Sequence, residues 1–295
     1  MKILFVFVLI LFIILTIKDF YQMQTIKSDD FAKFTRKYIY PLEIFIFSPM
    51  LLFLLNEKKH IKFICILIFI LSFIAMILTG SRGGWLAIFC GFLFLLFFVG
   101  FLNKKIFKIL IFLSLSAILF LLLIFSSNIE KPSYLKMKFK QLFEGDTSLR
   151  LEYVWPGAIG TYLELPLENK LLGRSLGRIT YAEDFSNWYI KKHKNSPPYI
   201  YSPHNFYIYL LYKQGIVGFF IFSFLIYMIF KELLSTLLDV NKNLEFRSFA
   251  LFILASFINL LVHGFFEDTR FIQWIFILSL ITGFNHLIKK QLSES

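Results

Sequence analysis

The residues Ser202-Pro203-His204-Asn205 lead directly into FYIYLLYKQGIVGFFIFSFLIYMIF, residues 206–230. This second stretch is apolar over more than the roughly 20 residues that a helix needs to cross a bilayer. The imidazole of His204 is therefore expected at a membrane–water boundary and not in a soluble core. Within the apolar run, Gly215 and Gly218 present small surfaces that would let another helix approach closely.

Similar apolar runs recur along the chain, at about residues 3–17, 38–55, 61–79, 85–102, 106–125, 249–266 and 271–288. The 295 residues are 58% hydrophobic, and the excess over a soluble protein lies in these runs. The sequence therefore predicts an all-α integral membrane protein with about eight transmembrane helices. The first run is interpreted as an uncleaved span. Pro49 predicts a kink inside the second run.

Residues 126–203 contain no apolar run of spanning length and form the one segment outside the membrane that is large enough to fold on itself. The predicted organisation is five transmembrane helices in 1–125, a large loop with short helices in 126–203, and three transmembrane helices in 204–295. Pro203 suits the first turn of a helix, so the sixth span is expected to begin beside His204.

The net charge of +12 comes largely from Lys and Arg between the apolar runs. Basic residues at those places set membrane topology and contact anionic headgroups, and no soluble basic domain is present, so nucleic acid is not an expected partner. A cytoplasmic N-terminus puts most short basic loops inside and the 126–203 loop outside, where Arg82, Arg150 and His204 also lie. The basic 18–37 linker is the one discordant loop. The two cysteines lie in apolar runs, so neither a disulfide framework nor a metal site is expected.

Arg82 stands in the expected turn Gly80-Ser81-Arg82-Gly83-Gly84, between two spans. Its guanidinium either reaches a lipid headgroup or binds a substrate phosphate with two parallel hydrogen bonds. Arg150 is expected in the first turn of an amphipathic helix, where a cation is unfavourable for the helix dipole. It is either a solvated charge or a substrate contact.

His204 and Asn205 are expected at a helix N-terminus, which attracts anions, and a neutral imidazole there can accept a proton. The glycine-rich stretch that contains Arg174 and Arg178 matches no phosphate-loop or dinucleotide motif. It is interpreted as a loop that contacts phosphate or sugar, or as a simple turn.

The spacing of His204, Asn205, Gly215 and Gly218 resembles the signature of the O-antigen ligase family. Ser81-Arg82-Gly83-Gly84-Trp85 is similar to an arginine-containing stretch of that family. The segments Arg150 to Pro156 and Gly173 to Gly177 are similar to its periplasmic-loop stretch. Together these resemblances cover about residues 60–230.

The resemblance implies a glycosyltransferase of the GT-C type, with its active site facing the periplasm from the bacterial inner membrane. It implies inverting transfer of glycan from undecaprenyl diphosphate to the lipid A–core oligosaccharide, in lipopolysaccharide biosynthesis, with no metal or other cofactor. Arg82 and Arg150 would hold the diphosphate, and His204 would act as general base or as a diphosphate or acceptor contact. Trp155, Arg174, Arg178 and Asn205 are candidates for substrate contacts.

Family members typically have a longer N-terminal part with more spans, so the chain is expected to be a short member or a truncated frame. Two alternatives to the ligase stay open. The first is a surface-polysaccharide polymerase or a protein O-oligosaccharyltransferase, which would use the same donor with another acceptor. The second is a transporter of lipid-linked sugars, which would need polar residues in mid-span. Glu43, Asn259 and His263 are the few candidates for that role.

Overall fold

The computed structural model describes residues 2–23, 42–78, 81–102, 154–174, 178–193 and 203–266, with a few single positions elsewhere. These residues form helices and turns, and no strand occurs among them. The described helices that are long and apolar enough to cross a membrane are α4 (Lys59–Leu78), α5 (Arg82–Leu102), α12 (Phe206–Leu238) and α13 (Leu244–His263). The all-helical membrane class predicted from the sequence is confirmed for this part of the chain.

The other predicted spans are shorter or lie outside the description. The helix α1 (Lys2–Met23) and the segment 42–55 contain shorter apolar stretches. The runs at 106–125 and 271–288 lie almost entirely outside the described residues, so the total of eight spans stays a prediction. The helix α12 extends to Leu238, beyond the predicted end at Phe230, and α13 begins at Leu244, so only residues 239–243 lie between the two helices.

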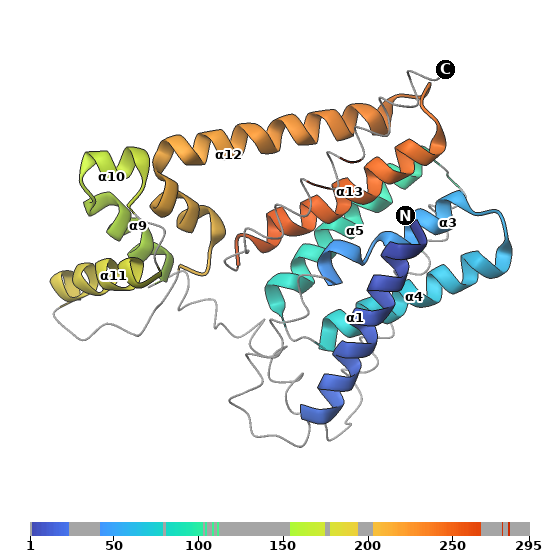
Figure 1. Cartoon of the computed structure of the whole chain (residues 1–295), viewed down its shortest axis with the longest axis horizontal. Helices are drawn as coiled ribbons and strands as arrows, with labels where there is room; N and C mark the ends of the chain where they lie inside the picture. The colour runs from blue at the N-terminus through green and yellow to red at the C-terminus, as the bar shows by residue number, and fades with distance from the viewer. Residues whose placement is uncertain are drawn as a thin grey trace.

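The helix α13 is buried over most of its length and packs against α5, α12 and α3 (Ser48–Leu55), as Figure 1 shows. It runs antiparallel to α5. Gly91 of α5 lies against Asn259 and Ala255 of α13, and Gly83 lies against His263, at the last turn of α13. Small residues at such contacts let helix backbones approach closely inside a membrane.

The second apolar run is a broken helix. Residues 42–45 are helical, a turn follows at 46–47, and α3 begins at Ser48 with Pro49 in its first turn. Because proline has no backbone N–H, it removes a helical hydrogen bond at this point, and the predicted kink is confirmed. Polar side chains of α13 bind the carbonyls beside the break: Ser256 Oγ donates to Ile44 O at 2.7 Å, and Asn259 Nδ2 donates to Glu43 O at 3.1 Å. These bonds satisfy backbone groups that lipid cannot.

Three short helices lie beside the first limb of α12, residues 206–214: α9 (Trp155–Glu164), α10 (Leu167–Leu172) and α11 (Arg178–His193). A small apolar core joins α9 and α11 to that limb and includes Tyr162, Tyr181, Phe185 and Tyr212. Beyond it, the backbone of α12 breaks at Gly215, where φ is 64°. Figure 1 shows the second limb turning away to run beside α13.

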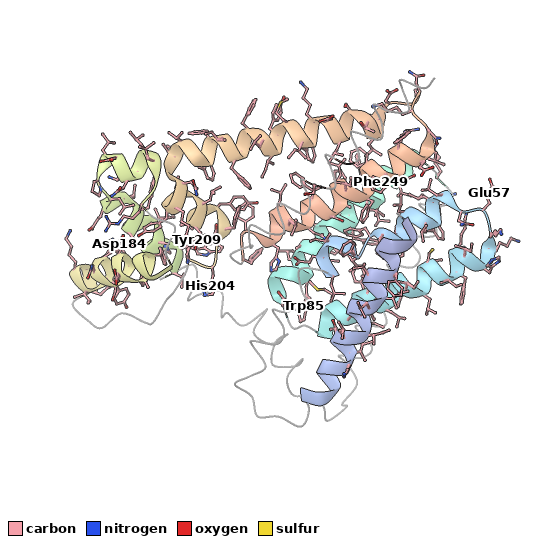
Figure 2. The ribbon with its side chains drawn as sticks, in the orientation of Figure 1. Glu57, Trp85, Asp184, His204, Tyr209 and Phe249 are labelled. Carbon is pink, nitrogen blue, oxygen red and sulfur yellow. The ribbon has the colours of Figure 1, made fainter. Side chains whose placement is uncertain are left out.

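The chain reverses direction at two ends of the bundle. The turns between α3 and α4 and between α12 and α13 lie at one end, where Glu57 is labelled in Figure 2, and Phe249 is labelled in the part of α13 nearer to that end. The starts of α5 and α12 lie at the other end, with Trp85 and His204 labelled. Several basic residues belong to the first end: Lys58, Lys59, Lys62, Lys242 and Arg247. Which end faces outward stays a prediction from this charge bias.

Candidate functional site at the end of the helix bundle

The first turn of α5 begins at Ser81. Gly84 N donates to Ser81 Oγ at 3.2 Å, and Trp85 N donates to Ser81 O at 2.9 Å, so Ser81 caps the helix. Arg82 is therefore the first residue of α5. The prediction that Arg82 lies in a turn is wrong. The hydroxyl of Ser81 accepts a hydrogen bond from one of the N–H groups that a helix start leaves without a partner, so the helix begins directly after Ser81. Trp85 Nε1 donates to Met76 O at 3.1 Å and ties this turn to α4.

Gly83 and Gly84 are needed for close packing, because they lack a side chain, and not for the backbone dihedral angles of a turn. A Cβ on Gly83 would lie 2.7 Å from Cβ of Phe266 and 3.2 Å from Cδ2 of His263. A Cβ on Gly84 would lie 2.4 Å from the methyl carbon of Met76 and 3.1 Å from Oε1 of Glu43. The first turn of α5 therefore rests directly on residues from three other segments of the bundle.

The start of α12 is capped by Asn205. Its buried Oδ1 accepts hydrogen bonds from Tyr207 N at 3.0 Å and from Ile208 N at 3.1 Å. Pro203 precedes the helix, so its predicted place in the first helical turn is wrong: the capping amide fixes the start at Phe206. His204 has a φ of 47°, in the left-handed region that residues other than glycine seldom adopt.

The start of α12 is joined to the last turn of α13. Phe206 N donates to Gly264 O at 2.7 Å, and the hydroxyl of Tyr207 donates to Leu261 O at 2.6 Å. The rings of Tyr207 and Phe265 pack together in a tilted arrangement, with centroids 4.6 Å apart. Because Gly83 of α5 contacts the same turn of α13, the starts of α5 and α12 lie on either side of it. The structure thus brings the backbone of Arg82 and the residue His204 to one end of the bundle.

A buried carboxylate–imidazole pair lies beneath this end. His263 Nδ1 and Glu43 Oε2 are 2.8 Å apart, and both side chains are 0% exposed. Ionisable groups at such depth are costly unless they are paired, and they commonly serve function. From the sequence, Glu43 and His263 are candidates only as polar mid-span residues that a transporter would need. The one signal for the pair is that each residue interrupts an apolar run; nothing in the sequence indicates that they meet.

The N-termini of α5 and α12 therefore both contact the last turn of α13. A helix N-terminus carries a partial positive charge and free N–H groups, which favour an anion. The basic residue Arg82 begins one of these helices, and His204 precedes the other. The arrangement suits a phosphate-bearing ligand whose charge lies at the membrane boundary and whose apolar part lies in lipid. Among the described residues, no group of three or more His, Cys, Asp and Glu side chains could hold a metal ion.

Arg174 is engaged by Asp184. Its Nε and Nη2 donate to the two carboxylate oxygens at 2.8 and 3.2 Å, and the hydroxyl of Tyr212 donates to the same carboxylate. The carboxylate raises the pKa of the Arg174 guanidinium. Arg174 N also donates to Tyr212 O at 3.1 Å. These contacts join α11 to the first limb of α12, so only the Nη1 side of Arg174 is left to meet a substrate.

The remaining predicted site residues are placed as follows. Trp155 is the first residue of α9 and Arg178 the first residue of α11. Gly215 breaks α12, and Gly218 lies one turn further along, where a Cβ would meet the side chain of Gln214. Arg150 lies outside the described residues, as do the side chains of Arg82 and Arg178.

The fold and this site define a multi-pass membrane protein with polar groups gathered at one end of an apolar helix bundle. Residues 67–223, more than half of the 295-residue chain, match the family model described as O-antigen ligase. The chain belongs to the O-antigen ligase family, and the resemblance seen in the sequence is confirmed. Comparison with curated proteins gives no match.

Proposed function

We propose that the protein is an inverting glycosyltransferase. It transfers a glycan from undecaprenyl diphosphate to a sugar hydroxyl of the lipid A–core oligosaccharide, at the periplasmic face of the inner membrane. The observation that carries the proposal is the joint placement of two helix starts, with Arg82 and His204, around the last turn of α13. Membership of the O-antigen ligase family supports the reaction class.

The donor carries its own leaving group. The acceptor oxygen attacks the anomeric carbon, the bond from that carbon to the diphosphate oxygen breaks, and the acceptor proton passes to a base. Departure of the diphosphate is eased by fixed positive charge close to the diphosphate oxygens, where negative charge develops. We assign this task to Arg82 and Arg150, helped by the N-termini of α5 and α12. This chemistry needs neither nucleotide nor metal.

His204 is assigned to the acceptor side of the reaction. An imidazole is a suitable general base near neutral pH. The left-handed backbone at His204 and the cap formed by Asn205 fix its place just before α12. Trp155, Arg174 and Arg178 are proposed to contact the glycan, Arg174 through the Nη1 side that Asp184 leaves open.

The identity of the acceptor distinguishes the ligase from a surface-polysaccharide polymerase and from a protein O-oligosaccharyltransferase. Expression in a host strain that lacks its own O-antigen ligase should restore ladders of polymer-capped lipopolysaccharide. A change confined to polymer chain length would indicate a polymerase, and glycosylated protein would indicate an O-oligosaccharyltransferase. Either result would overturn the proposed acceptor while keeping the donor.

Transport of lipid-linked sugars is the alternative from another class. The polar mid-span residues on which it would depend are buried and bound to one another or to backbone: Glu43, Asn259 and His263. This arrangement supports the enzyme over the transporter. Movement of the donor across vesicle membranes without glycan transfer would contradict the proposed function.

A further inference from the structure

The buried pair Glu43–His263 takes no part in the reaction described above, yet it touches the segments that carry it. His263 ends α13, and the next residue, Gly264, accepts the hydrogen bond from Phe206 at the start of α12. Glu43 lies in the broken helix before α3. The pair therefore sits where the broken helix, α13 and α5 meet.

The pair lies close beneath the first turn of α5. A Cβ on Gly84 would lie 3.1 Å from Oε1 of Glu43, and a Cβ on Gly83 would lie 3.2 Å from Cδ2 of His263. The helix start that carries Arg82 is thus seated on the two members of the pair. A displacement of the pair would move this turn.

The remaining contacts hold the pair in place. Asn259 Nδ2 donates to the backbone carbonyl of Glu43 at 3.1 Å, one turn before His263 on the same face of α13. Asn259 Oδ1 lies against Gly91 of α5, where a Cβ would be only 2.2 Å away. The broken helix, α13 and α5 are therefore held together by contacts at two successive turns of α13, one at His263 and one at Asn259.

We propose that Glu43 and His263 are positioning residues for glycan transfer: their buried pair seats the first turn of α5, and with it Arg82, against the turn of α13 that anchors the start of α12 beside His204. This inference rests on the proposed function. The pair contacts neither donor nor acceptor and acts through Arg82. A displacement of about 1 Å at a reacting group costs on the order of a hundredfold in rate, so such seating matters for turnover.

The test uses the full-length protein in lipid nanodiscs, with undecaprenyl-diphosphate-linked glycan as donor. The double variant Glu43→Met/His263→Leu replaces the pair by apolar residues, an exchange that commonly preserves stability. We expect an unchanged thermal unfolding midpoint, a kcat lowered by about ten- to a hundredfold, and a donor KM within about threefold of wild type. Glu43→Gln and His263→Asn keep a hydrogen-bonding partner at the contact and should retain most of the kcat.

Ser256→Ala is the matched control. It removes the 2.7 Å bond to Ile44 O from the same face of α13, away from the first turn of α5. It should lower the unfolding midpoint and leave kcat unchanged. If the double variant proves unstable, Gly84→Ala tests the seating of the same turn with the pair retained, because its Cβ would meet the methyl carbon of Met76 at 2.4 Å and Oε1 of Glu43 at 3.1 Å, and it should lower kcat similarly.

A double-mutant cycle with Arg82→Lys identifies the route of the effect. If the pair acts through Arg82, its replacement costs much less kcat when Arg82 is already lysine. Additive losses, or a stable double variant with wild-type kcat, would overturn the inference while the proposed function stands. A wild-type protein that transfers nothing from this donor would overturn both.

Discussion

His204 combines an imidazole with a left-handed backbone, and the two properties can be separated by substitution. Asparagine adopts positive φ more readily than most residues, so His204→Asn should keep the loop and the start of α12 while removing the base. If His204 is the base, kcat should fall by about 10²- to 10⁴-fold with little change in KM. The measurement is initial transfer rate at equal membrane levels. A raised KM at unchanged kcat would make His204 a binding residue, and an unchanged rate would remove it from the site.

Arg82 is expected to act through both the positive charge and the planar shape of its guanidinium group. Arg82→Ala should abolish transfer, and Arg82→Lys should leave a small residual rate, because an ammonium cannot form the two parallel hydrogen bonds that a guanidinium gives to phosphate. Inhibition by free undecaprenyl diphosphate checks the assignment in Arg82→Lys, whose residual rate can be measured and which should need more of the inhibitor for half-inhibition than wild type. Equal half-inhibition of wild type and Arg82→Lys would show that the diphosphate binds elsewhere.

At the scale of elements, α12 is two limbs joined at Gly215. Gly173 and Gly215 meet there, since a Cβ on Gly215 would lie 2.2 Å from Leu171 O and one on Gly173 would lie 2.0 Å from Lys213 O. Both glycines have positive φ, at 91° and 64°. The close contact fixes the short helices α9, α10 and α11 on the first limb.

Gly215→Ala should therefore loosen the short helices. The strained φ and the clash with Leu171 O together cost about 1–3 kcal/mol, and proteolytic cleavage between residues 154 and 193 should become faster. Gly264→Ala is the control, because Gly264 has a right-handed φ of −56° and its Cβ would meet no atom closer than 3.3 Å. Equal cleavage in the two variants would contradict the role given to the Gly173–Gly215 contact.

Sequence patterns predicted the apolar helices among the described residues, because lipid forces long uninterrupted runs and because Pro49 lacks the N–H that the interior of a helix needs. They failed at helix starts. The capping by Ser81 and Asn205 depends on which side chain reaches a free N–H, and this moved Arg82 into α5 and Pro203 out of α12. Gly83 and Gly84 suggested a turn in the sequence. In the structure, glycine is needed at these positions because segments distant in the chain pack closely against them.

At the scale of the whole molecule, the candidate site could be predicted only in part. His204 and Arg82 stood out as polar residues at span ends, and charge bias put them on one side of the membrane. The buried pair Glu43–His263 and the ion pair between Arg174 and Asp184 join separate segments of the fold, so no local sequence pattern predicts them. Within the bundle, α13 is the element that unites these parts, because α5, α12 and the broken helix all pack against it.

The most direct test of the central claim is glycan transfer by the purified protein in nanodiscs, with undecaprenyl-diphosphate-linked glycan as donor, lipid A–core as acceptor and excess chelator. We expect the glycan to appear on lipid A–core with inverted anomeric configuration and undecaprenyl diphosphate to be released in equal amount. Arg82→Ala should form neither product above background, and His204→Asn should form both at a rate lowered by about 10²- to 10⁴-fold. Retained configuration, a strict need for a divalent metal, or full activity in both variants would contradict the account.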